Sequence, residues 1–490
     1  MSRSDETQDY RRHPVTRRDA LKIAGASLAS TTLITSPMST AAVATPAHGT
    51  KHIVIAGGGI SGLCCGYELM KRGHDVTVLE ASGRTGGHVF TVHDPLAKGF
   101  YADGGAEHFT KPGYEIYWQY IEEFDLPAIE YPRRKDTIRF INGKMYTEEM
   151  LADRNVLKGF GFNRKEVDYL TQNPWWDLQS LYYGPYLDNF QDEYQPFGVG
   201  FDELDQVSAL EVIKNDGASG AAQSFIGGKS VSALYAFWCA AILKLRGVPI
   251  YPPGIYRIEG GNQRLPDAFA NKLGHRVRLG CPITHIRHGE SGVTVTYKEF
   301  GQPKTLDADY LVNCIPLPAF SRIPVDPEWP EEKQFVIDNV SYGSYCRVLL
   351  QSRNKFWEKD GISINMSFEG SGLWNVWQTA HEVPGERALL MGSASAGTTR
   401  KESLDSFRRQ YPYKTDQLEQ ACVIDWSQDE WAAACERRPF PQGELASFWP
   451  QLMTPVGRIH FAGSYADNLN WGQEAATRSA NRVAIEIDQA

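Results

Sequence analysis

The sequence predicts an α/β fold whose parallel sheet begins with a strand, a glycine-rich turn, a helix and a second strand between residues 51 and 80. Length and composition support this prediction. A chain of 490 residues should hold two to four structural units at about 150 residues each. Hydrophobic residues make up 42% and charged residues 22%, which is typical of globular proteins and excludes disorder. The net charge of −9 argues against a nucleic-acid-binding protein.

The first 44 residues have the pattern of an export signal. Arg17 and Arg18 precede an apolar run from Ala20 to Ile34 and the small-residue sequence 42–44. This pattern is typical of a twin-arginine signal peptide, which the twin-arginine export machinery recognises. The run is shorter than the roughly 20 apolar residues that span a bilayer, so we expect no stable membrane anchor. We predict cleavage after Ala44 and a mature protein that is periplasmic or secreted.

The cysteines show no metal-ligand spacing. They are scattered and form no CxxC pair, which argues against a zinc site, and we expect no metal. We interpret most of them as small core residues. A disulfide is an alternative, because an exported protein enters an oxidising compartment. The eight residues are Cys64, Cys65, Cys239, Cys281, Cys314, Cys346, Cys422 and Cys435.

The segment from Lys51 to Lys71 has the features of a dinucleotide-binding unit. Residues 51–56 predict a strand, and residues 63–71 predict a helix. Between them, Gly57 permits a tight turn, Gly59 lets a pyrophosphate approach the backbone, and Gly62 allows close packing of helix and strand. The helix N-terminus then favours the negative phosphates.

A second strand is predicted at 75–79, and it ends in Glu80. An acidic residue at this distance from the glycines accepts hydrogen bonds from an adenosine ribose. Strand, glycines, helix, strand and acid occur together, which makes a chance match to this unit improbable.

Further segments, in order along the chain, resemble motifs of the flavin amine oxidase family. Residues 84–88 resemble its RxGGR segment, 103–106 its "DxGa" turn, 260–265 its "GG..L" helix start, 308–316 its returning strand, 458–463 its "riyFAG" strand, and 470–476 its "GyveGA" turn and helix. These matches are specific for the superfamily and say much less about the substrate.

The resemblance implies a Rossmann-type FAD-binding domain of the GR2-like class, interleaved with an α+β substrate domain. The FAD-binding domain would be built from residues 50–110, 252–328 and 454–490, with a smaller antiparallel layer at about 285–297. The substrate domain would be built from 111–251 and 329–453.

The cofactor implied by the resemblance is FAD. Residues expected to bind it are Gly57, Gly59, Ile60, Ser61, Gly62, Glu80, Ala81, Arg84, Gly86, Gly87, His88, Gly105, Ala106, Ile283, Gly463, Ser464, Trp471, Gln473 and Ala475.

In this family a C–H bond next to nitrogen gives a hydride to flavin N5, and the protein positions the reactants. The helix that begins near Trp471 would stabilise the reduced ring through its dipole. Trp471 would form one wall of the substrate cage, or would serve only in packing. Arg347 occupies the place of a family lysine linked to the reaction with oxygen, and arginine is not equivalent to lysine. The use of oxygen is therefore in doubt, and a structural ion pair is the alternative role.

The second aromatic wall of the family cage falls on Glu436. Glu436 would bind a cationic amine or pair with Arg437 or Arg438. The preceding Cys435 stands where two monoamine oxidases attach flavin, so a covalent flavin is an alternative. After the "DxGa" turn, the family's carboxylate-binding arginine is missing, which disfavours an α-amino acid. Glu107 and His108 stand there instead, with His108 as a general base or as a buried structural histidine.

Aromatic residues are dense between Tyr114 and Tyr194, and residues 145–216 hold 14 acidic and 5 basic residues. Acidic and aromatic walls would suit a cationic ligand. Solvated helix faces over an aromatic core are an equally good interpretation.

Three functions remain open at this point. The first is an exported FAD-dependent oxidase or dehydrogenase that converts an amine to an imine, with oxygen or another electron acceptor. The second is a flavin dehydrogenase or desaturase that acts on a C–C or C–O bond. The third is an FAD-stabilised binding protein without turnover. The sequence does not indicate an oligomeric state.

Overall fold

The computed structural model describes residues 49–369, 372–413, 416–469 and 472–490. The predicted signal peptide and Trp471 lie outside the described residues.

The first strand–turn–helix–strand unit folds as predicted. It consists of β1 (His52–Ala56), α2 (Ile60–Lys71) and β2 (Asp75–Leu79), and the two strands pair in parallel. The helix begins at Ile60 rather than at Leu63, because the backbone is already helical within the glycine turn. The Leu63 N–H donates to the Gly59 carbonyl at 3.0 Å.

Later parts of the chain complete this sheet. Every pairing between its strands is parallel. Strands of a parallel sheet are covered on both faces and are apolar throughout, as the fully buried run 53–56 shows. The order is β10 (Val277–Arg278), β2, β1, β14 (Tyr310–Asn313) and β23 (Ile459–Phe461).

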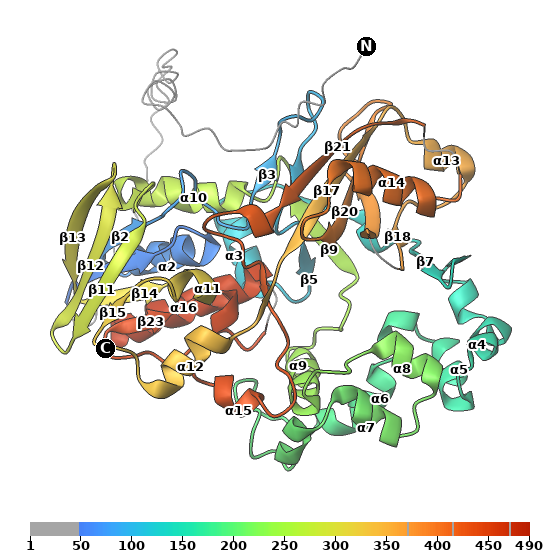
Figure 1. Cartoon of the computed structure of the whole chain (residues 1–490), viewed down its shortest axis with the longest axis horizontal. Helices are drawn as coiled ribbons and strands as arrows, with labels where there is room; N and C mark the ends of the chain where they lie inside the picture. The colour runs from blue at the N-terminus through green and yellow to red at the C-terminus, as the bar shows by residue number, and fades with distance from the viewer. Residues whose placement is uncertain (1–48, 370–371, 414–415, 470–471) are drawn as a thin grey trace.

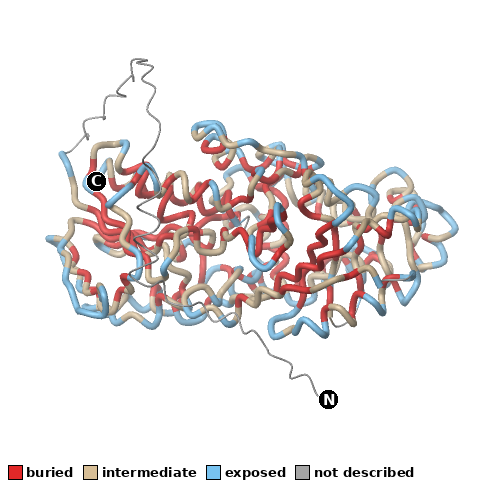
Figure 2. The backbone as a smooth tube through the Cα atoms, turned by 90° about the horizontal axis from the view of Figure 1, so that it is seen from above, coloured by how far each residue is buried: buried red, intermediate tan, exposed pale blue. Residues whose placement is uncertain are grey.

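Helices α2 and α16 (Gly472–Gln489) pack against each other beside this sheet, and α10 (Arg264–Leu273) packs on α2 (Figure 1). Leu63, Phe269 and Val483 come from these three helices and are fully buried in one apolar cluster. Figure 2 shows the buried residues concentrated along the strands and on the adjoining helices. Helix α3 (Glu115–Glu123) packs on α16.

The antiparallel layer predicted near residues 285–297 is present as a hairpin of β11 (Ile283–Gly289) and β12 (Gly292–Glu299). Two further strands extend it to the order β13 (Gln302–Ala308), β12, β11 and β15 (Val325–Asp326).

A larger, seven-stranded sheet lies at the upper right of Figure 1, where its strands from the later part of the chain are drawn in orange. Its central strands pair antiparallel, and α14 (Arg400–Gln410) packs on β21. A short helix, α13 (Phe356–Asp360), follows β17. The strand order is β21 (Leu418–Asp425), β17 (Tyr345–Ser352), β20 (Ala388–Ser395), β19 (Leu373–Thr379), β18 (Met366–Ser367), β7 (Ile138–Ile141) and β8 (Lys144–Tyr146).

Six α-helices between residues 154 and 245 form a group at the lower right of Figure 1. Tyr182, Tyr183 and Trp238 are buried in its core, so the aromatic density of this region serves packing. The helices are α4 (Arg154–Phe160), α5 (Arg164–Leu170), α6 (Ser180–Leu187), α7 (Ala209–Asn215), α8 (Gly220–Ile226) and α9 (Ala233–Leu245).

Short elements connect these parts. The small sheets are β5 (Phe109–Lys111) with β9 (Gly254–Ile258) and β6 (Ala128–Glu130), β3 (Thr91–Val92) with β4 (Ala102–Asp103), and β16 (Tyr342–Gly343) with β22 (Glu436–Arg437). The short helices are η1 (Pro132–Arg134), α11 (Leu317–Phe320), α12 (Glu331–Asn339) and α15 (Leu445–Phe448).

All eight cysteines are free, and five of them are buried, which agrees with the interpretation of most of them as small core residues. Across the described parts of the chain, we find no helix that combines the length and apolarity needed to cross a membrane.

Candidate functional site

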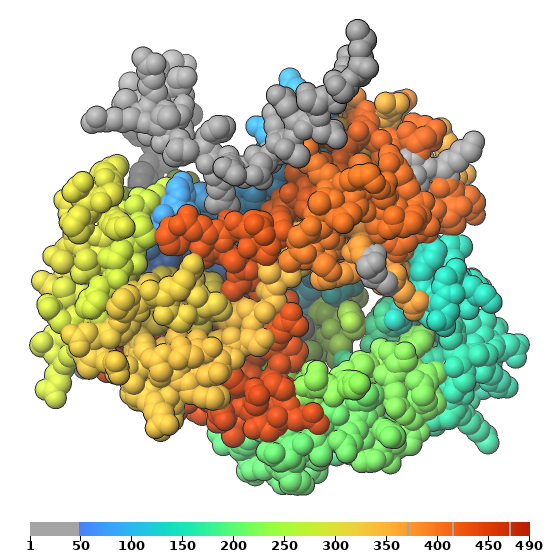
Figure 3. Space-filling model, viewed as in Figure 1, coloured from blue at the N-terminus to red at the C-terminus, as the bar shows by residue number. Residues whose placement is uncertain are grey.

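A cavity of about 700 Å³ opens at the carboxyl ends of β1, β2, β14 and β23. In the sheet, β2 lies on one side of β1 and β14 on the other, so this edge is the point where the strand order reverses. Open α/β sheets bind their ligands at such a point. The protein surface is hollowed between the seven-stranded sheet and helices α8 and α9 (Figure 3).

Most of the residues predicted to bind the cofactor line this cavity. Gly62 and Ala475 do not line it, because both are used in packing behind the lining residues. The lining includes Gly57, Gly59, Ile60, Ser61, Glu80, Ala81, Arg84, Gly86, Gly87, His88, Gly105, Ala106, Ile283, Gly463, Ser464 and Gln473.

The glycine turn forms a backbone cradle that fits a dinucleotide. Gly57 has φ +102°, which favours glycine, and a Cβ on Gly62 would lie 1.9 Å from the Gly57 carbonyl oxygen. Gly59 forms a backbone bridge with Gly86, and a Cβ on Gly59 would meet nothing closer than 4.0 Å. The strand, the turn and the RxGGR-like loop therefore leave an open, side-chain-free approach to backbone N–H groups, as FAD requires.

Glu80 closes the other end of this cradle. Its two carboxylate oxygens accept hydrogen bonds from the N–H groups of Gly58 at 2.6 Å and Ser82 at 2.7 Å. These bonds fix the carboxylate at the cavity edge, where the remaining lone pairs can accept from ribose hydroxyls.

The "DxGa"-like turn is joined to the "GG..L"-like helix start. Asp103 accepts hydrogen bonds from Thr91 Oγ1 and from the Asn262 N–H, both at 2.8 Å. Asn262 in turn donates to the Ala106 carbonyl at 3.2 Å. Burial raises the pKa of Asp103 to about 6. Two segments that are far apart in the sequence are therefore locked together beside the cavity.

Glu107 and His108 lie together at the cavity wall with Arg133, which comes from η1. His108 Nδ1 lies 2.7 Å from Glu107 Oε1, and Arg133 Nη1 pairs with the same oxygen. Arg133 Nη1 also lies 3.1 Å from Nδ1. Because the carboxylate oxygen is the nearer partner and only accepts hydrogen bonds, we assign the proton to Nδ1, which leaves Nε2 as the basic nitrogen.

Opposing effects act on this cluster. Burial alone would raise the pKa of Glu107, but Arg133, His108 and Arg347 hold it well below its usual range. Burial lowers the pKa of His108 below 6.5, with Glu107 acting in the opposite direction. Glu107 is therefore ionised and His108 is neutral near pH 7.

Arg347 lies on β17 at the back of the same wall. Its guanidinium donates to Ser393 Oγ at 2.8 Å and to the Gly105 carbonyl at 3.0 Å. The side chain is buried and lines the cavity. Arg347 is thus held by neutral acceptors, and its charge acts on Glu107 across the wall.

Cys435 and Glu436 border the cavity from the opposite side, near β22. Cys435 Sγ lies 3.5 Å from Ser344 Oγ, and burial raises the pKa of its thiol. Partial burial also raises the pKa of Glu436, whose side chain is exposed toward the cavity. Within the described residues, Glu436 forms no ion pair with Arg437 or Arg438.

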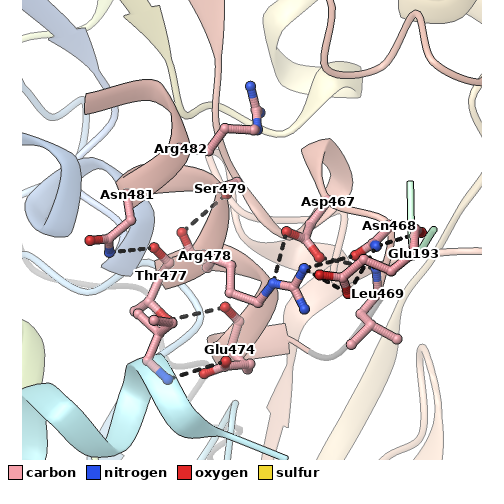
Figure 4. Close-up of polar contacts among 12 residues, drawn as sticks. Glu193, Asp467, Asn468, Leu469, Glu474, Thr477, Arg478, Ser479, Asn481 and Arg482 are labelled. Atoms are coloured by element: carbon pink, nitrogen blue, oxygen red, sulfur yellow. Dashed lines mark hydrogen bonds and ion pairs between the residues drawn. The ribbon is translucent and has the colours of Figure 1, made fainter. Parts of the chain in front are cut away.

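The start of α16 is fixed by the loop before it. Arg478 donates to Tyr194 at 2.9 Å and to Asn468 at 3.2 Å, and it pairs with Asp467 at 3.4 Å (Figure 4). Gln473 is buried and donates to the His108 carbonyl at 3.1 Å. These contacts connect the helix start to the cavity wall, while Trp471 itself lies outside the described residues.

The sequence pattern missed other lining residues. Tyr342, Tyr345 and Trp431 line the cavity, and Arg134 lines a smaller pocket beside it. The basic run 133–135 is a visible signal, but the linear sequence does not place it beside residue 107. Residues 145–216, which were considered as a ligand wall, contribute nothing to either lining.

The chain is similar to known proteins over most of its length. A family model described as "Flavin containing amine oxidoreductase" matches residues 60–488. The L-amino acid oxidase of Bothrops pictus is 27% identical over 466 residues, which cover 90% of each chain.

Solved structures of related fold were also found. Putrescine oxidase bound to putrescine has a TM-score of 0.76 at 22% identity, over 90% of this chain and 99% of that chain. Cyclohexylamine oxidase from Brevibacterium oxydans has a TM-score of 0.73 at 22% identity, over the same shares. These two structures share the fold of this chain, a mixed α/β architecture.

Proposed function

Because the chain belongs to the flavin-containing amine oxidoreductase family, and is therefore an FAD-dependent oxidoreductase, we propose that it oxidises the C–N bond of an amine to an imine, which water then hydrolyses. The observation that carries this proposal is a histidine at the cavity wall whose Nδ1 lies 2.7 Å from the buried carboxylate of Glu107.

An amine is mostly an ammonium ion near pH 7, and it must lose a proton before its neighbouring C–H bond can give up a hydride. His108 Nε2 is the group that we propose to take this proton, since Nδ1 is committed to Glu107. FAD, when bound in the cradle, accepts the two electrons with the hydride. Gln473 supports the base by holding its backbone carbonyl.

Glu436 is proposed to attract the cationic substrate. It borders the cavity and forms no ion pair among the described residues. Its carboxylate can carry a negative charge, which an aromatic side chain at this position would lack. Relatives named L-amino acid oxidase and putrescine oxidase also act on compounds that carry an amino group. An amine substrate is thus favoured over an alcohol or a C–C bond.

Anaerobic mixing of the purified holoenzyme with a panel of amines tests the proposal. We expect at least one primary or secondary amine to bleach the absorbance of the oxidised flavin. Alcohols and saturated ketones of the same size serve as controls for the C–O and C–C alternatives. Bleaching by these controls alone would replace the proposal with the dehydrogenase alternative, and bleaching by none would favour a binding protein.

We further propose that Arg347 limits the use of oxygen, so that another electron acceptor completes the cycle. Arg347 carries its charge in a rigid, always protonated group that is already bonded to Ser393 and Gly105. Reoxidation of the reduced enzyme by oxygen and by an artificial acceptor should be compared in the wild type and Arg347→Lys. If the lysine variant reacts with oxygen no faster, this assignment is wrong.

Export and domain division remain proposals as well. The twin-arginine pattern at Arg17 and Arg18 supports export to the periplasm or beyond, with cleavage after residue 44. We retain residues 50–110, 252–328 and 454–490 as the proposed FAD-binding domain, and 111–251 with 329–453 as the proposed substrate domain.

A further inference from the structure

A side pocket of about 230 Å³ opens beside the main cavity, next to η1. His108, Tyr114 and Glu436 line both spaces, whereas Arg134 lines only the side pocket. The two spaces therefore adjoin at these shared residues, and Arg134 lies on the far side of them from the main cavity.

Arg134 is held in place but is not neutralised. One N–H donates to the Pro252 carbonyl at 3.3 Å, and Cζ lies 5.1 Å from the centre of the Tyr251 ring. In the described part of the chain, no carboxylate lies within ion-pair distance of its guanidinium. Arginine stays charged even when partly desolvated. An anion bound beside Arg134 would offset the cost of burying this charge.

Glu436 supplies the opposite charge in the same space. It borders the main cavity and the side pocket, yet it does not pair with Arg134 among the described residues. Two adjoining pockets with shared wall residues therefore offer a carboxylate that can bind a cation and a guanidinium that can bind an anion. A ligand with both charges complements them.

We propose that the substrate is an ω-amino acid, whose ammonium group faces Glu436 and whose carboxylate binds Arg134 in the side pocket. This inference rests on the proposed oxidation of an amine. Arg134 lines only the side pocket and lies beyond ion-pair distance of Glu436 among the described residues, so we place the two ligand charges on different carbons. That separation distinguishes an ω-amino acid from an α-amino acid, in which both groups share one carbon. Guanidinium and carboxylate match as a two-point hydrogen-bonded pair.

Anaerobic flavin reduction by matched compounds tests the inference. The compounds are γ-aminobutanoate, δ-aminopentanoate, n-butylamine, which lacks the carboxylate, and α-aminobutanoate. We expect one of the ω-amino acids to half-saturate the enzyme at a concentration at least about tenfold below that of n-butylamine. In Arg134→Met, this concentration should rise at least about tenfold for the ω-amino acid, with the limiting rate nearly unchanged.

Two controls separate recognition from structure. n-Butylamine should behave alike in wild type and Arg134→Met, and Arg287→Met, which alters an exposed arginine on β11, should leave every value unchanged. Equal use of n-butylamine and the ω-amino acids would overturn the proposal. So would a preference for α-aminobutanoate, or an Arg134→Met defect that is the same for all amines.

Binding of a carboxylate that cannot react provides a second readout. Calorimetry with pentanoate should show binding to the wild-type holoenzyme that is at least about tenfold weaker in Arg134→Met. If no amine reduces the flavin but this difference is present, the amine oxidation fails while the anion subsite stands. If the two proteins bind pentanoate equally, the role given to Arg134 is wrong.

Discussion

Glu107 and Glu436 border one cavity but have opposite pKa shifts. Desolvation disfavours the ionised form of both carboxyls. Arg133, His108 and Arg347 outweigh it at Glu107, whereas Arg437 does not outweigh it at Glu436. The neighbouring charges therefore decide the state of each carboxyl. Glu107 is suited to hold a histidine in one tautomer, and Glu436 is suited to meet a cation that arrives with the ligand.

The Glu107 cluster should make stability depend on pH. The folded pKa of Glu107 lies below its ordinary value of 4.5, so its contribution is present above pH 4.5 and is lost as the pH falls further. Glu107→Gln leaves Arg133 without its buried partner, and we expect a loss of about 3 kcal/mol at pH 7. The difference in melting temperature from the wild type should shrink below pH 4.5.

The matched control is Glu290→Gln, which changes an exposed glutamate in the β11–β12 turn. It should leave the melting temperature unchanged at both pH values. A Glu107→Gln defect of the same size at pH 7 and well below pH 4.5 would contradict the assigned ionisation.

At the scale of elements, the contact between α2 and β1 depends on the absence of a side chain at Gly62. A Cβ there would lie 1.9 Å from the Gly57 carbonyl oxygen, which is part of the backbone and cannot move aside cheaply. We expect Gly62→Ala to cost about 1–3 kcal/mol or more and to weaken retention of FAD. Differential scanning calorimetry and the flavin content of the purified protein measure these effects.

Gly83→Ala is the matched control for this change. A Cβ on Gly83 meets nothing within 4 Å, although the residue lies in the loop that follows Glu80. Its melting temperature and flavin content should equal those of the wild type. Equal behaviour of Gly62→Ala and the control would show that the helix does not need this close approach.

The loop before α16 depends on Arg478. In Figure 4 this side chain points toward Asp467, Asn468 and Glu193, which come from two distant segments. Arg478→Met would leave the buried Asp467 without its counter-charge, and we expect a loss of about 3–5 kcal/mol. Thermal unfolding should show this loss of stability. The purified variant should also retain less FAD.

The control for Arg478 is Arg408→Met on α14. Arg408 forms an exposed pair with Asp405 at 3.9 Å, and such surface pairs contribute about 0–1 kcal/mol. A stability change in Arg478→Met that is no larger than the control's would contradict the structural role of this network.

At the scale of the whole molecule, local patterns predicted the fold class and the first strand–turn–helix–strand unit well. The strand at 75–79 and the glycine turn are determined by neighbouring residues in the sequence, so the sequence alone was enough to locate them. Arg133 and Arg134 were missed because they reach the site through tertiary packing of η1, which no spacing rule describes. The aromatic segment was ambiguous because the same residue types build cores and ligand walls.

Export is also a property of the whole chain. If the twin-arginine pair directs export, replacing Arg17 and Arg18 together with lysine should leave the enzyme folded and flavin-loaded in the cytoplasm. Fractionation of expressing cells, with flavin content as the measure of folding, checks this. An exported double variant would show that another signal directs the protein.

The central claim is that this FAD-dependent enzyme removes hydrogen from the carbon next to an amine nitrogen. The most direct test compares anaerobic flavin bleaching by the best amine with bleaching by the same amine deuterated at that carbon. If that C–H bond breaks during flavin reduction, bleaching is rapid, deuterium slows it several-fold, and an imine-derived aldehyde is the product. Absence of bleaching with every amine, or bleaching without formation of a carbonyl product, would contradict this claim.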